Sequence, residues 1–167
     1  MKERIEVHNQ DEFDACVKDG NIAVVMNCSV KTYGNNSVIA MNNSSVIAFD
    51  NSSIEAWGNS SVEAWDNSSV KAFDNSSIEA FDNSSVIARD NSSVIARGNS
   101  SVIARGNSSV IAMNNSSVKA CDSVFIRLFS CLKIKASSSV VILKHSNTGK
   151  IEGGIQLDSI NEKDKQS

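Results

Sequence analysis

The sequence contains no proline, and aromatic residues make up only 5% of its 167 residues. A core built around large aromatic side chains is therefore excluded, and the apolar content lies mostly in Val, Ile and Ala. The formal net charge of −3 is too small to indicate a nucleic-acid binder or a solvating acidic chain. A chain of this length can form one domain around a core of small side chains.

Long apolar runs are also missing, because no stretch approaches the ~18 apolar residues that a membrane helix needs. No apolar segment of the secretory type occurs in the opening residues, MKERIEVHNQDEF. No CxxC or metal-type spacing relates the cysteines, and we expect free thiols at Cys16, Cys28, Cys121 and Cys131. Asn-x-Ser sequons recur so often that glycosylation would cover the molecule. We therefore expect a bacterial or viral protein of the cytoplasm, where sequons are not read.

What is present is an eight-residue pattern. A β-branched residue recurs every eighth position from Ile22 to Ile142, with Ala two positions later from Ala40 to Ala120 and usually Ser two positions earlier. Residues two apart in a strand share a face, so Ser, Val and Ala are expected to point inward. Their uniformity is required if every layer must fit the layer below. A fixed short period of this kind predicts an all-β protein, a parallel β-solenoid.

The remaining octad positions predict the turns. Asn stands three residues before each β-branched residue from Asn27 to Asn115. The position just before this one holds Gly, Asn or Asp in every octad from Gly34 to Asp122. These residues tolerate positive φ and bond to their own backbone in turns. We expect a strand of four or five residues, then a short turn, with stacked Asn side chains bonded along the corners. A helix conflicts with the period, and a disordered chain would lack the strict apolar register.

Two or three octads can make one turn of the solenoid. Three would enclose a wide interior that Val, Ala and Ser fill poorly, so two octads are favoured. Two per turn would place Lys71 beside Glu55, whereas three would stack Glu79 on Glu55. Both arrangements remain open at this point, as does the handedness.

The two ends differ from the middle. DEFDACVKDG predicts a short helix, with Phe13 and Cys16 on the face that would plug the first layer. Larger residues such as Phe125, Leu132 and Leu143 enter near the other end, which suits a closing core or a dimer contact. The expected segments are an N-terminal strand-helix cap over 1–20, the regular solenoid over 21–123, degenerate repeats with a C-terminal cap over 124–157, and a polar tail over 158–167 that we expect to be disordered.

The repeated phrases NSSVIARG and DNSSIEAW resemble the octapeptide arrays of uncharacterised bacterial and phage proteins. Those arrays also open with a cap similar to VHNQDEFDACVKDGN and close with a segment similar to LKHSNTGKIEGGI. The resemblance covers nearly the whole chain. It implies a β-solenoid of bacterial or phage origin and brings no agreed activity.

Chemistry has few candidate residues. Glu55, Glu63 and Glu79 occupy equivalent outward positions, as a carbohydrate-active β-helix would require, but a regular solenoid offers no pocket to shift carboxyl pKa values. Calcium rolls need a repeated Gly-Gly-x-Gly-x-Asp motif, which is missing, and His8 and His145 stand alone. An ice-binding face would repeat Thr at regular outward positions, and this chain has almost none there. We therefore expect no enzyme, no cofactor and no metal site.

The outward positions instead change in order along the chain, from aromatic to Arg. Trp, Phe and Arg are the residues that most often anchor interfaces, so we expect a protein partner or self-association as a homodimer. The sequence does not favour nucleic acid or membrane as a partner. An alternative is a phage-type inhibitor, acting as mimic or plug, of a bacterial defence protein such as a CRISPR or restriction nuclease. The predicted interaction surface comprises Phe49, Trp57, Trp65, Phe73, Phe81, Arg89, Arg97 and Arg105.

Overall fold

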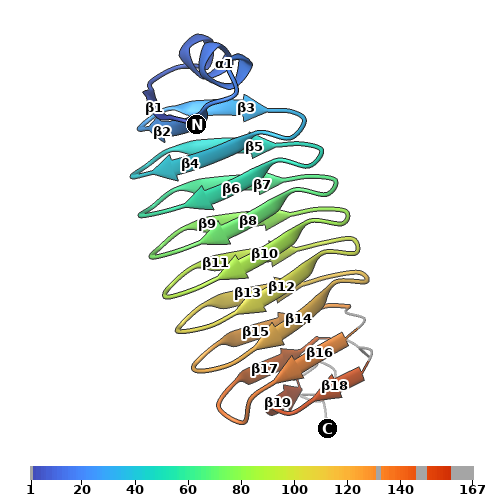
Figure 1. Cartoon of the computed structure of the whole chain (residues 1–167). Helices are drawn as coiled ribbons and strands as arrows, with labels where there is room; N and C mark the ends of the chain where they lie inside the picture. Colours follow the sequence, from blue (N-terminus) through green and yellow to red (C-terminus); the bar gives the residue numbers. More distant parts are fainter. Residues whose placement is uncertain (1, 131–132, 146–149, 159–167) are drawn as a thin grey trace, which may run out of the picture.

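The computed structural model describes residues 2–130, 133–145 and 150–158 and is a flattened parallel β-solenoid (Figure 1). Ten strands form sheet A and nine form sheet B, and the chain alternates between the two sheets. Strand partners lie sixteen residues apart through the regular part, as Val86 on Val70 does, so the all-β solenoid with two octads per turn is confirmed. The expected tail beyond Asp158, together with Cys131 and Leu132, lies outside the described residues.

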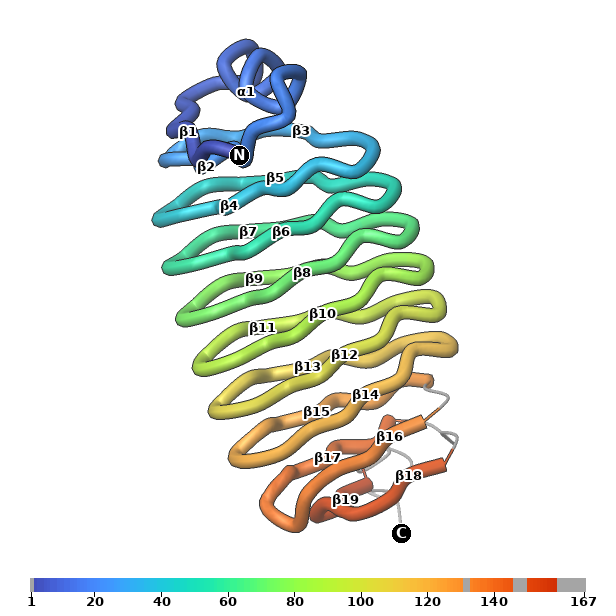
Figure 2. Tube along the Cα trace, in the orientation of Figure 1, coloured from blue at the N-terminus to red at the C-terminus, as the bar shows by residue number. Residues whose placement is uncertain are grey.

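The strands are short and nearly equal in length, so successive turns stack closely along the rod (Figure 2). Sheet A contains β1 (Arg4–Val7), β2 (Ile22–Met26), β4 (Ser37–Met41), β6 (Ser53–Ala56), β8 (Ser69–Ala72), β10 (Ser85–Ala88), β12 (Ser101–Ala104), β14 (Ser117–Ala120), β16 (Lys133–Ala136) and β18 (Lys150–Glu152). Sheet B contains β3 (Ser29–Thr32), β5 (Ser45–Ala48), β7 (Ser61–Ala64), β9 (Ser77–Ala80), β11 (Ser93–Ala96), β13 (Ser109–Ala112), β15 (Phe125–Leu128), β17 (Val141–Lys144) and β19 (Ile155–Asp158).

The core is the inward set of Ser, Val or Ile, and Ala that the repeat predicts. Val70 and Ala72 are 1% and 0% exposed, and the inward serines from Ser44 to Ser116 are equally buried. Their hydroxyls are not left unsatisfied, since the Ser76 Oγ donates to the carbonyl of Phe73 at 2.7 Å. Such a bond to the residue three positions earlier closes the turn and removes the cost of burying a hydroxyl.

The turns follow the predicted positions. Left-handed backbone, with φ between 55° and 78°, occurs at Gly34, Asn42, Asp50, Gly58, Asp66, Asp74, Asp82, Asp90, Gly98, Gly106, Asn114 and Asp122. The aspartates also connect successive turns, because the Asp74 carboxylate accepts the N–H of Gly58 in the preceding turn at 3.1 Å. The expected corner bonds between Asn side chains occur, for example from Asn75 Nδ2 to Asn59 Oδ1 at 3.4 Å.

The octad phase is not kept at the N-terminal end, where the prediction for Ile22 is wrong. Ala23 and Val25 are the buried residues of β2, and Ala23 pairs with Val38, fifteen positions away. The run IAVVM is apolar on both faces, so alternation alone cannot decide which face is inward. Ile22 is left only half-buried.

A strand and a helix cap the first turn, as expected. Helix α1 (Gln10–Lys18) begins after Asn9, whose side chain accepts the N–H of Glu12 at 3.0 Å, and it packs against β1, β2 and β3. Phe13 and Cys16, the buried residues of α1, are 1% and 4% exposed. In Figure 1 the helix covers the N-terminal end of the rod, and β18 and β19 lie at the opposite end.

Candidate interaction surface

The predicted surface residues stand immediately after the strands, where each chain segment leaves its sheet. Their backbone still takes part in the hydrogen bonding between turns, since the Trp57 N–H donates to Ala40 O and the Phe73 N–H to Ala56 O, both at 2.9 Å. The strands of the two sheets end at opposite edges of the roll (Figure 1). The residues consequently form two ladders: the first contains Met41, Trp57, Phe73, Arg89, Arg105 and Cys121, and the second contains Tyr33, Phe49, Trp65, Phe81, Arg97, Met113, Phe129 and His145.

In the first ladder, Trp57 and Phe73 stack with ring centroids 4.0 Å apart and planes at 11°. The Arg89 guanidinium lies over the Phe73 ring at 5.7 Å. An offset aromatic pair contributes ~0.5–1.5 kcal/mol and an exposed cation–π contact ~0.5–1 kcal/mol. These contacts hold the side chains of three successive turns in one fixed array.

The second ladder is longer. Phe81 stacks on Trp65 at 3.9 Å, and Arg97 lies over the Phe81 ring at 5.6 Å. Phe49 lies 6.3 Å from Trp65, and Tyr33 stacks on Phe49 at 4.9 Å. A Trp–Phe–Arg series at sixteen-residue spacing is therefore present along each edge.

Exposure differs along the ladders. Tyr33 is 59% exposed, Trp57 37% and Met41 36%, whereas Trp65 and Phe73 are half-buried. The indole Nε1 of Trp65 is buried without a hydrogen-bond partner in the described residues. Stacking hides the ring faces, so a partner would meet mainly ring edges and the exposed guanidinium groups.

The outer faces of the sheets carry the acidic residues considered for catalysis. Glu55 binds Lys71 at 3.1 Å on sheet A, as two octads per turn predicted. Glu63 and Glu79, two of the three equivalent acidic residues, are direct neighbours on sheet B and form a like-charged pair. Glu79 borders a shallow trough of about 320 Å³ along the open face of that sheet. Over the part of the chain that the structure describes, no three His, Cys, Asp or Glu side chains group as metal ligands would.

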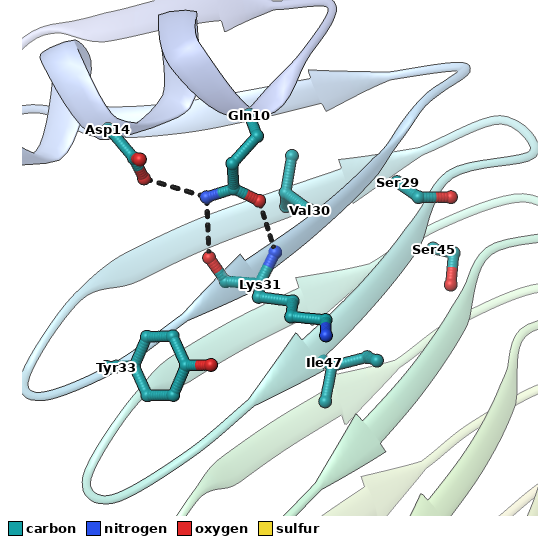
Figure 3. Close-up of a pocket in the computed structure, with 8 residues that line it drawn as sticks. All are labelled: Gln10, Asp14, Ser29, Val30, Lys31, Tyr33, Ser45 and Ile47. Carbon is teal, nitrogen blue, oxygen red and sulfur yellow. Dashed lines mark hydrogen bonds between the residues drawn. The ribbon is translucent and has the colours of Figure 1, made fainter.

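The structure adds a pocket that the repeat did not predict. It has a volume of about 540 Å³ and lies between α1 and the first strands of sheet B, with Gln10, Asp14, Lys31 and Tyr33 among its lining residues (Figure 3). The octad around Tyr33 departs from the consensus, which is why this residue was not included in the predicted surface. Counting in steps of sixteen from Phe81 would also have found Phe129, which stacks on His145 at 4.6 Å.

The cysteines of the described segments are not paired with one another. Burial raises the pKa of the Cys16 thiol, with a smaller contribution from Asp19. Burial likewise raises the pKa of Cys28. Both groups are therefore poor nucleophiles at neutral pH. Cys121 belongs to the first ladder, with its Sγ 3.6 Å from Asp122 Oδ2.

Comparison with known proteins identified no matching family model, curated protein or solved structure. Within the described ranges, no helix has the length and apolarity required to cross a bilayer.

Proposed function

We propose that the protein is a non-enzymatic, rigid binding element that docks another protein along its two edge ladders. The observation that carries this proposal is the placement of Trp, Phe and Arg at consecutive turns, in positions where the scaffold accepts many residue types. Met41, Met113 and Cys121 occupy equivalent positions, and the N–H groups of Met113 and Cys121 make the same backbone bond as the aromatic residues do. Folding therefore does not require large aromatic side chains there, and their concentration in neighbouring turns supports a role in recognition.

Rigidity favours such a role. The ladder side chains are held by stacking before any partner arrives, so little rotamer entropy is lost on binding. Arg89 and Arg97 each present a guanidinium that lies over a Phe ring, and turn aspartates such as Asp90 contribute charges of the opposite sign. This combination suits a partner surface with an apolar centre and a polar rim.

A second candidate is an inhibitor of a bacterial defence enzyme, such as a CRISPR or restriction nuclease. The observation that favours it is a row of exposed carboxylates at the turns beside the second ladder. Asp50, Asp66 and Asp82 follow one another at sixteen-residue spacing and are all exposed. A regular line of negative charge on a rigid rod could occupy a nucleic-acid channel as a mimic.

The proposal is tested by quantitative affinity capture from bacterial lysate with a Trp57→Ser/Phe73→Ser variant. We expect a partner retained by the wild type to bind at least about tenfold more weakly, because hot-spot truncations cost ~2 kcal/mol or more. The control is Ile103→Ser, which changes a half-buried residue on the outer face of sheet A. Equal capture by wild type and ladder variant would reject the ladder as the binding surface. Capture of a nuclease that depends on Asp50, Asp66 and Asp82 would favour the inhibitor.

A further inference from the structure

A parallel solenoid ends in two strands whose outer N–H and C=O groups lack a neighbouring strand. At the N-terminal end of sheet B, the side chain of Gln10 takes the place of that strand. Its Oε1 accepts the N–H of Lys31 at 2.7 Å, and its Nε2 donates to the Lys31 carbonyl at 3.0 Å (Figure 3). The amide group thus pairs with β3 as a peptide group would. A third bond, from Gln10 Nε2 to Asp14 Oδ1 at 2.7 Å, holds the amide group in this position.

The rest of this end is protected in other ways. Helix α1 covers the core and packs against β1 and β3, the edge strands of the two sheets at this end. The N-terminal end is therefore protected against the addition of another strand.

The C-terminal end has no equivalent device among the residues that the structure describes. β18 pairs with β16 and β19 pairs with β17, and within those residues no strand adjoins their outer edges. Ile155 and Leu157 are 51% and 49% exposed on the outer face of β19. They pair with the half-buried Val141 and Leu143, so the apolar surface continues onto the neighbouring strand.

The charge pattern of β18 is complementary to itself. Ile151 points inward, in register with the buried Ile134, so Lys150 and Glu152 both lie on the outer face. If this strand meets a second copy of itself antiparallel about Ile151, each lysine stands opposite a glutamate of the other chain. Directly opposed residues of opposite charge stabilise an antiparallel pair, and like charges destabilise it.

We propose that a second copy of this chain docks at the C-terminal end, with the two β18 strands antiparallel and Lys150 opposite the partner's Glu152. The same two-fold arrangement brings the β19 edges into the interface and covers Ile155 and Leu157. Because the contact uses the same surface on both copies, it closes on itself. The protected N-terminal ends then face outward, and the assembly stops at two copies. This interface is separate from the edge ladders and does not depend on the function proposed for them.

Sedimentation velocity over a range of concentrations tests the interface, using wild type, K150E, E152K and an equimolar mixture of the two variants. We expect a wild-type dimer and about tenfold weaker dimers of each single variant, because each variant opposes like charges across the two-fold. In the mixture, opposite charges again face one another between chains, and dimerisation should recover.

The mixture separates this interface from the contact within one chain, where Lys150 Nζ lies 2.6 Å from Glu152 Oε1. Each variant loses that internal ion pair, and mixing cannot restore it. A mixture as weak as its components would therefore overturn the proposal. A wild type that stays monomeric at about 100 μM, a concentration above the Kd of most specific interfaces, would overturn it as well. Circular dichroism of each variant verifies that the chains remain folded.

Discussion

The alanine that ends the inward triplet in every octad from Ala40 to Ala120 sets how closely the two sheets can approach. Ala88 is 0% exposed and lies in register between Ala72 and Ala104. A column of methyl groups leaves no room for a longer side chain, because protein interiors are packed to crystalline density. The adjacent outward residue has no such constraint.

We therefore expect Ala88→Leu to lower the free energy of unfolding by ~1–3 kcal/mol, since overpacking forces neighbouring side chains or backbone to shift. The matched control is Ile87→Leu, which keeps the volume of a half-buried outward residue and should change stability by less than about 1 kcal/mol. Urea unfolding followed by circular dichroism measures both. Equal losses in the two variants would mean that the inward column is not tightly packed.

At the scale of the element, every strand and turn repeats the same register. Because strand partners lie sixteen residues apart, Val70 pairs with Ile54 of the preceding turn and with Val86 of the following turn. A shift of one residue reverses the inward and outward faces of everything that follows. Loss of a complete turn leaves this relation intact.

Insertion of one residue after Asn75 should consequently unfold the rod or split it into two parts. Deletion of residues 85–100, one complete turn, provides the control. Its flanking strands retain their inward faces and should fold with a single cooperative transition. Thermal melting compares the two chains with the wild type. An unchanged melting curve for the insertion would contradict the register seen in the sheets.

The repeat predicted the elements well because its consensus positions are set by stacking. Inward Val and Ala, left-handed Asp and Gly, and the pairs of Glu55 with Lys71 and Trp57 with Phe73 all follow from the period. The errors lie where the period weakens. The eight-residue count places Ile22 in the core, and the run IAVVM, apolar on both faces, gives no signal against that register. The role of Gln10 could not be predicted because its partner is the backbone of Lys31, which no sequence pattern marks.

For the whole molecule, the two ends have opposite properties. The N-terminal end is closed by α1 and by the Gln10 amide, and the C-terminal end exposes β19 and its apolar side chains. This difference between the ends decides whether a rod remains discrete or extends into a fibre, because unprotected strand edges pair with other chains.

Gln10→Ala should make the protein form species larger than a dimer, because the N–H and C=O groups of Lys31 would face solvent at the edge of sheet B. Gln10→Glu serves as a comparison: its carboxylate can accept the N–H but cannot donate to the carbonyl, so an intermediate effect is expected. Light scattering against concentration and time reports the change. If both variants match the wild type, α1 alone is sufficient to protect this end.

The sixteen-residue register also has a genetic consequence. Recombination between neighbouring repeats of the gene would add or remove coding segments without disturbing the stack, provided that each segment encodes whole octads. Gain of two octads would lengthen both edge ladders equally. Gain of a single octad would exchange the edges for every later residue and bring Arg and aromatic side chains into new combinations. The rod can therefore diversify its surface by copying errors alone, while its core sequence remains the same.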